Sequence, residues 1–136
     1  MKSRTVSVVV FTDGKDVIIQ ERGSHSKVGE KYGLWGGKIA KGETKENAIK
    51  RELQEEIGYV PEILKYLGKY TYLVSEEGKY KGWKINQFVF TSPITPELKK
   101  AKVKEGGGII KMPLDVASQG QGFPQGSTSF MSVLKK

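Results

Sequence analysis

The spacing of apolar and polar residues divides the chain into several strand-like runs and one strong helix-like segment. Short runs rich in valine, isoleucine and aromatic residues, bounded by glycine and charged residues, are typical of β-strands. Asp13-Gly14 supplies a hairpin turn between the first two runs, and Glu76-Glu77-Gly78 separates the next two. We therefore expect strands over residues 4–11, 16–22, 63–74, 80–91 and 109–112.

The helix-like segment covers residues 45–57, and both of its ends carry the expected signals. Thr44 is a good N-terminal cap, and Gly58 stands where a left-handed C-terminal cap belongs. Upstream of it, the paired glycines Gly36 and Gly37 interrupt a short apolar stretch, which suggests the close approach of another backbone or of a ligand. The other segments are expected to be a loop over 23–33, a charged link over 96–104 and a terminal helix over 127–134.

These elements fit an α/β protein with a mixed sheet, folded as one domain over residues 1–136. The longest apolar runs are too short to span a bilayer, and no signal-peptide cleavage site follows the N-terminus. We therefore expect a cytoplasmic protein that has no membrane partner. The oligomeric state expected is a monomer or a homodimer.

Composition limits the chemistry that the chain can support. It has no cysteine and one histidine, so a bound metal must be held mainly by oxygen, which favours magnesium, manganese or calcium. The formal net charge is +8. Such a charge fits either a lysine-rich surface or the attraction of a polyanion such as a nucleotide or RNA, and charge alone does not separate the two.

The helix over residues 45–57 carries two adjacent stripes. At 100° per residue, Ile49, Leu53 and Ile57 fall within an arc of about 80°, which is enough to face a core. Three glutamates occupy the neighbouring arc, and like charges at this spacing repel one another. They are either part of a charged surface or ligands of a divalent cation, which would give each carboxylate a partner. These glutamates are Glu52, Glu55 and Glu56.

A wider pattern favours the second interpretation. In order and spacing, the chain resembles the signature of the Nudix (MutT-type) hydrolase family, although Tyr59 stands where that family usually has an aliphatic residue. The matching positions are Gly37, Glu43, Arg51-Glu52-Leu53, Glu55-Glu56 and Gly58. The resemblance implies a mixed sheet sandwiched between helices, a Nudix-type α/β/α sandwich.

The resemblance also implies roles for the residues of the signature. Glu52, Glu55 and Glu56 would bind one or more Mg²⁺ or Mn²⁺ ions, with the Gly37 carbonyl as a further ligand. Arg51 would orient Glu52 and pair with Glu43. Gly36 and Lys38 are the expected substrate contacts, with a plain surface lysine as the alternative for Lys38.

The implied reaction is in-line attack of water on a phosphorus of a nucleoside diphosphate derivative. Members of the family differ in which glutamate acts as the general base, and Glu52 and Glu56 are both candidates. Glu105 is a third candidate, because many members place a further glutamate on the loop before the last strand. The alternative for Glu105 is a solvated loop acid.

The substrate is less constrained. The residues around Gly36-Gly37 and Arg51-Glu52 are similar to those of the branch that hydrolyses oxidised purine nucleoside triphosphates to a monophosphate and pyrophosphate. Alternatives are a dinucleoside polyphosphate, ADP-ribose or the 5′ end of RNA, and several lysines would suit a longer polyanion. They are Lys65, Lys69, Lys79, Lys81 and Lys84. A non-catalytic RNA-binding module is the remaining alternative, and the presence of all three helix glutamates argues against it.

Overall fold

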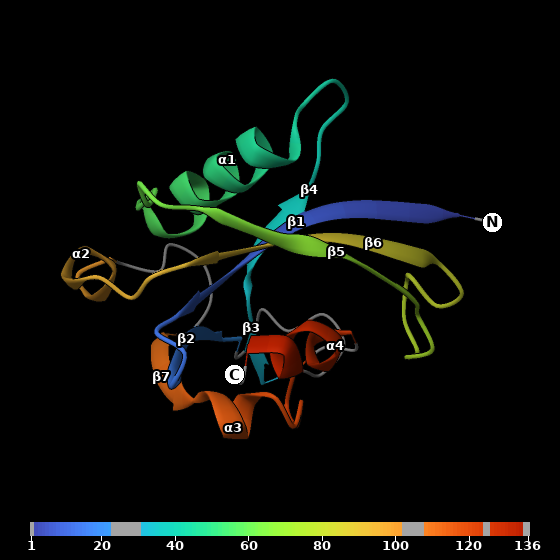
Figure 1. Cartoon of the computed structure of the whole chain (residues 1–136). Helices are drawn as coiled ribbons and strands as arrows, with labels where there is room; N and C mark the ends of the chain where they lie inside the picture. Colours follow the sequence, from blue (N-terminus) through green and yellow to red (C-terminus); the bar gives the residue numbers. More distant parts are fainter. Residues whose placement is uncertain (1, 23–30, 102–107, 124–125, 135–136) are drawn as a thin grey trace.

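The computed structural model describes residues 2–22, 31–101, 108–123 and 126–134 (Figure 1). Its strands are β1 (Ser3–Thr12), β2 (Asp16–Glu21), β3 (Tyr32–Gly33), β4 (Trp35–Lys38), β5 (Lys65–Leu73), β6 (Lys84–Ser92) and β7 (Ile109–Pro113). Its helices are α1 (Lys45–Ile57), α2 (Pro96–Lys99), α3 (Leu114–Ala117) and α4 (Ser127–Met131), the last followed by a 3₁₀ turn over Ser132–Leu134. The expected mixture of strands and helices is confirmed.

The strands of the described residues form one mixed, seven-stranded sheet. Its main path runs β3-β2-β1-β6-β5, while β4 pairs with β1 and β7 pairs with β2. Only the pairing of β1 with β6 is parallel within this described sheet, and the other pairings are antiparallel. The length of β1 allows it to pair with β4 through Val6–Val9 and with β2 through its last two residues.

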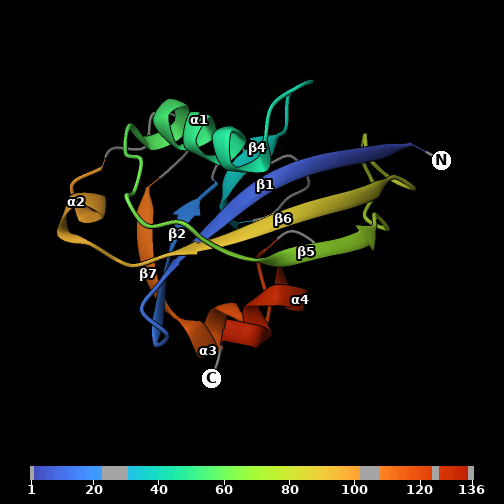
Figure 2. The same ribbon diagram turned by 45° about the horizontal axis from the view of Figure 1, so that its top comes forward.

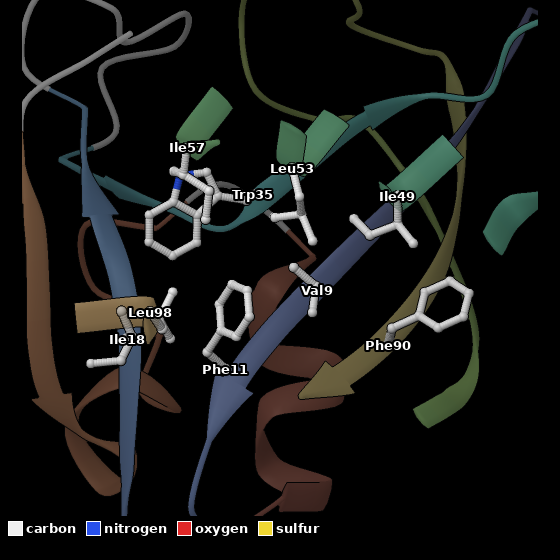
Figure 3. Close-up of a cluster of buried hydrophobic side chains, with 9 residues drawn as sticks. All are labelled: Val9, Phe11, Ile18, Trp35, Ile49, Leu53, Ile57, Phe90 and Leu98. Carbon is white, nitrogen blue, oxygen red and sulfur yellow. The ribbon is translucent and has the colours of Figure 1, made fainter. Parts of the chain in front are cut away.

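Helices cover both faces of the sheet, because alternate side chains of its central strands point to opposite sides. On one side, Val9 and Phe11 of β1 pack against Ile49, Leu53 and Ile57 of α1 (Figure 3). On the other side, Val10 contributes to a second core with residues of α3 and α4. The turned view shows α1 on one side of the sheet and α3 and α4 on the other (Figure 2). The predicted α/β/α sandwich is confirmed.

The structure departs from the sequence predictions at the short elements. Part of the expected charged link forms α2, which begins where the Thr95 hydroxyl accepts a hydrogen bond from the Leu98 N–H. The short helix α3 was not predicted either, nor was β3 at the end of the expected loop. Helices this short contain little more than one turn, so they carry no repeating apolar stripe that a sequence pattern can reveal.

The structure qualifies one further prediction, and another stays a prediction. The expected terminal helix is divided into α4 and a 3₁₀ turn. Glu105 lies outside the described residues. Within the described ranges, no helix combines the length and the apolar character that crossing a membrane requires.

Candidate active site

The helix α1 is fixed at both ends by local contacts that the sequence predicted. The Thr44 hydroxyl accepts a hydrogen bond from the Asn47 N–H at 3.1 Å, which satisfies one of the unpaired donors of the first turn. Gly58 has a left-handed backbone with φ of 66°, and its N–H donates to the carbonyls of Leu53 and Gln54. These caps confirm the predicted bounds of the helix, and they hold its glutamates at defined positions over the sheet.

Gly36 lets β4 lie unusually close to β1. Its φ is 151°, and an added Cβ would stand 2.1 Å from the Ser7 carbonyl oxygen and 2.8 Å from the Val8 Cα. Only glycine fits this approach. The Gly36 N–H donates a hydrogen bond of 3.1 Å to Oε1 of Glu56, which ties the acidic side of α1 to β4.

Gly37 makes room for a second carboxylate of α1. An added Cβ at this position would lie 2.5 Å from Oε1 of Glu52. The neighbouring atoms belong to the end of a flexible side chain and not to the backbone, so the glycine is required by the position of Glu52. The two paired glycines therefore bring β4 against Glu52 and Glu56, the close approach expected from the sequence.

Arg51 connects the residues around the helix. It makes two hydrogen bonds to the Glu43 carboxylate, at 2.8 and 2.9 Å, and donates to Oε1 of Glu52 at 3.0 Å and to the Lys38 carbonyl at 3.0 Å. The paired guanidinium holds the pKa of Glu43 at about 2, and the Ala40 N–H adds to this effect. The pairing of Arg51 with Glu43 and Glu52 follows the geometry expected from the signature.

Glu52 lies in a less solvated setting than Glu46 and Glu55 of the same helix. Its side chain is 16% exposed, against 59% for Glu55. Burial raises the pKa of Glu52, while the hydrogen bond and charge of Arg51 act in the opposite direction. Any further positive charge that comes close to this carboxylate would stabilise its charged form.

The structure brings together most of the predicted site residues that it describes, while the side chains of Glu55 and Lys38 are exposed. Gly36, Gly37, Glu52 and Glu56 meet between β4 and α1, with Arg51 beside them. The Glu55 side chain is largely exposed, with its Oε1 3.5 Å from Nη1 of Arg51.

The side chain of Lys38, at the end of β4, is exposed. In the described part of the chain, no three acidic or histidine side chains converge closely enough to hold a metal ion as they lie. Glu52 and Glu55 both lie next to Nη1 of Arg51, while Glu56 accepts the Gly36 N–H.

The family is decided by comparison with known proteins. The NUDIX domain model matches residues 1–126. The chain belongs to the Nudix hydrolase family.

Several known Nudix proteins are similar to this chain. The 8-oxo-dGTP diphosphatase of Escherichia coli is 34% identical over 73 residues, which cover 53% of this chain and 57% of that protein. The match therefore spans little more than half the length of that relative. An uncharacterized Nudix hydrolase of Listeria monocytogenes is 30% identical over 124 residues, covering 88% of this chain and 70% of that protein.

A solved structure supports the fold assignment. The MutT protein of Methanosarcina mazei superimposes with a TM-score of 0.75, over 98% of this chain and 93% of that protein. The two sequences are 16% identical, so this likeness concerns the fold alone. The predicted membership of the Nudix hydrolase family is confirmed.

One residue that positions α1 was not found from the sequence. Ser7 of β1 is completely buried, and its hydroxyl donates a hydrogen bond of 2.9 Å to the Lys45 carbonyl at the start of α1. This contact fixes the first turn of the helix onto the sheet. The available signal was a lone polar residue inside a run of valines, on the same side of the strand as Val9.

Proposed function

We propose that this chain hydrolyses a purine nucleoside triphosphate, in its oxidised form, to the monophosphate and pyrophosphate, with Mg²⁺ or Mn²⁺ as cofactor. The observation that carries the proposal is the meeting of two glutamates of α1 with the paired glycines of β4. Glu56 accepts the Gly36 N–H, and Glu52 fills the space that Gly37 leaves open. Membership of the Nudix family supports the same reaction class.

The residues of this site fit a hard divalent cation. Glu52, Glu55 and Glu56 offer carboxylate oxygens, the ligands that Mg²⁺ and Mn²⁺ prefer. The missing Cβ of Gly37 leaves a cradle next to the Glu52 carboxylate, which a larger residue would fill. These three glutamates and the Gly37 carbonyl would hold the cation, which would supply positive charge to the phosphate oxygens and make water more acidic.

The chain's own residues would bind and orient the reactants. A carboxylate takes a proton from water, the water oxygen bonds to phosphorus, and the anhydride oxygen leaves with the electron pair of the broken bond. Glu52, Glu56 and Glu105 are the candidates for this base. Arg51 holds the Glu52 carboxylate in one orientation through a hydrogen bond of 3.0 Å, which makes it a positioning residue.

The proposed substrate contacts lie on β4. The exposed side chain of Lys38 stands at the end of the strand that carries both glycines, where its ammonium group can reach a phosphate. Gly36 presents its backbone at the same place. The relative from Escherichia coli is named for its action on 8-oxo-dGTP, which supports an oxidised purine as the base.

A substrate panel tests this assignment. Phosphate release would be measured with Mg²⁺ and added pyrophosphatase for normal and 8-oxo nucleoside triphosphates, ADP-ribose, diadenosine polyphosphates and triphosphorylated RNA. We expect the highest kcat/KM for an oxidised purine triphosphate. Preference for another member would reassign the substrate within the family, and silence across the panel with either metal would argue for a non-catalytic module.

A mutational test addresses the metal site directly. We expect Glu55→Gln and Glu56→Gln to lower kcat by at least about a hundredfold, because each removes a charged ligand or base from the reacting centre. Glu46→Gln is the matched control, since it makes the same change on the exposed first turn of the same helix. All three variants are expected to keep the melting temperature of the wild type within a few degrees. Full activity in the Glu55 and Glu56 variants would make the metal assignment wrong.

A further inference from the structure

Part of the sheet face that α1 covers is left open. Along β1, every second residue points to this side, and the register places partners from β6 and β5 beside each one. The row of Val9 and Phe90 is buried beneath α1. Closer to the N-terminus, the strands continue beyond the start of α1, as the two views of the ribbon show (Figures 1 and 2).

We call this region the open face and define it by six residues of three adjacent strands. They are Thr5 of β1, Lys84, Asn86 and Phe88 of β6, and Lys69 and Thr71 of β5. Lys69, Thr71 and Lys84 are exposed, and the other three are half-buried. The opposite side of the same strands is different, because Ile85 and Gln87 are buried there.

A row of hydrogen-bonding side chains crosses the middle of the open face. The Thr71 hydroxyl donates to Oδ1 of Asn86 at 3.0 Å, and Nδ2 of Asn86 donates to the Thr5 hydroxyl at 3.5 Å. The row holds the Asn86 amide in one orientation. Hydroxyl and amide groups each keep further capacity to donate or accept, so the row can bond the edges of bases or sugar hydroxyls.

At the border with α1, lysine ammonium groups lie over aromatic rings. Nζ of Lys45 is 5.6 Å from the centre of the Phe88 ring, and Nζ of Lys69 is 5.8 Å from it. The ring of Tyr66, which is 42% exposed, lies 6.3 Å from that of Phe88. A stacking surface next to ammonium groups is the combination that single-stranded nucleic acids use, since bases stack while phosphates take the positive charge.

The charged residues of the three strands also favour a nucleic acid as the partner. Together β1, β5 and β6 contain lysine or arginine but no aspartate or glutamate. The whole chain carries a formal charge of +8, which adds a general attraction for polyanions. A second copy of the same face would be repelled by its like charge, and an acidic strand of phosphates is attracted.

We propose that the open face binds single-stranded RNA. Unpaired bases can stack on the Tyr66 and Phe88 rings when the flexible lysine side chains over them turn toward phosphates. The row through Asn86 can bond base edges and 2′-hydroxyl groups. Lys69 and Lys84 can neutralise phosphates on either side of that row. This surface does not include the proposed active site, because Glu52 faces Gly37 of β4, and β1 lies between β4 and β6. The proposal therefore goes beyond the hydrolysis of a nucleotide and does not depend on it.

Charge-reversed variants of equal net charge test the proposal. Fluorescence anisotropy would measure the binding of a labelled single-stranded oligoadenylate RNA to the full chain, in EDTA so that no metal-dependent hydrolysis occurs. Lys69→Glu with Lys84→Glu changes the open face. Lys99→Glu with Lys100→Glu makes the same change in charge at α2, beyond the opposite end of β6.

We expect the Lys69/Lys84 variant to lose at least about tenfold in affinity at low salt, and to show a weaker salt dependence. The control variant should lose less than about threefold. Asn86→Ala with Thr71→Ala leaves the charge unchanged and is expected to weaken RNA binding. Glu52→Gln should keep the wild-type RNA affinity, which separates this result from the fate of the proposed hydrolysis.

Several results would overturn the proposal. They are no RNA binding by the wild type, equal losses in the two charge-reversed variants, and full affinity in the Asn86/Thr71 variant. Equal affinity for duplex RNA or for single-stranded DNA would overturn the assignment to single-stranded RNA. Circular dichroism and retained nucleotide turnover would establish that the variants of the open face are folded.

Discussion

At the scale of single residues, the two adjacent glycines of β4 make room for different neighbours. Gly36 brings two backbones together, because an added Cβ would meet the Ser7 carbonyl oxygen at 2.1 Å. Gly37 instead accommodates a side chain, because its added Cβ would meet the Glu52 carboxylate at 2.5 Å. The first contact is between parts that cannot move, and the second involves the end of a flexible chain. A side chain at Gly36 would therefore disturb the fold itself, whereas one at Gly37 would disturb the candidate site.

This difference predicts opposite results for two alanine substitutions. We expect Gly36→Ala to lower the free energy of unfolding by roughly 2–4 kcal/mol, from backbone strain and the clash with β1. Gly37→Ala should change it by less than about 1 kcal/mol, since the Glu52 side chain can turn away. It should nevertheless lower kcat by roughly tenfold to a hundredfold, because the carboxylate is displaced. Urea unfolding and nucleotide turnover would measure the two effects, and matching losses of stability would contradict the distinction.

The sequence identified these glycines but could not separate their roles. Two glycines in an apolar stretch indicate a close approach, yet the pattern does not say what approaches. That depends on the pairing of β4 with β1 and on the position of α1, which are contacts between distant parts of the chain. The role of Ser7 was not predicted for the same reason, because its hydrogen-bond partner Lys45 lies far along the sequence.

At the scale of elements, the loop before α1 is fastened to the helix by the pair of Arg51 and Glu43. The carboxylate accepts two hydrogen bonds from the guanidinium and one from the Ala40 N–H. These contacts lower the pKa of Glu43 from 4.5 to about 2. A carboxyl whose pKa is lowered by folding stabilises the protein at pH values above its pKa in the unfolded chain. This stabilisation is lost as the pH falls through its pKa in the folded protein.

The pair predicts a pH-dependent effect of Glu43→Gln. Near neutral pH the wild type should melt at a higher temperature than the variant, because only the charged carboxylate makes the full interaction with Arg51. The difference should shrink as the pH falls from about 4.5 to about 2, the window between the two pKa values. Thermal unfolding followed by circular dichroism over this range would measure it. Glu62→Gln, at an exposed glutamate outside this pair, is the control. An equal change with pH in that variant would show that the effect does not come from the pair of Arg51 and Glu43.

The elements themselves were predictable to different degrees. The bounds of α1 followed from its apolar stripe, the Thr44 cap and the Gly58 cap, which are all local signals. The short helices α2 and α3 were missed because a single turn shows no periodicity and takes its stability from neighbours such as the core around Leu98 and Leu114. The assignment of three glutamates to one metal site came from a resemblance, and the exposed position of Glu55 was not visible in the pattern.

At the scale of the whole molecule, the two cores share their central strands. Val9 and Val10 are neighbours on β1 but pack on opposite sides, the first against α1 and the second with α3 and α4. The same holds for Val89 and Phe90 of β6. Because one pair of strands supplies both cores, a loss of packing on either side weakens the strands on which the other side depends. We therefore propose that the chain unfolds as one domain.

Matched core substitutions test this proposal. Leu53→Ala opens the core beneath α1 and Leu114→Ala opens the core at α3, and both leucines are almost fully buried. Each should lower the free energy of unfolding by about 2–5 kcal/mol. A Trp83→Phe background leaves buried Trp35 as the fluorescent reporter of the α1 side, while far-ultraviolet circular dichroism reports the whole chain. In both variants the two signals should change together at one lower urea midpoint, since a shared pair of strands cannot lose one core and keep the other. A Leu114→Ala protein in which Trp35 fluorescence keeps its wild-type midpoint would mean that the two sides unfold independently.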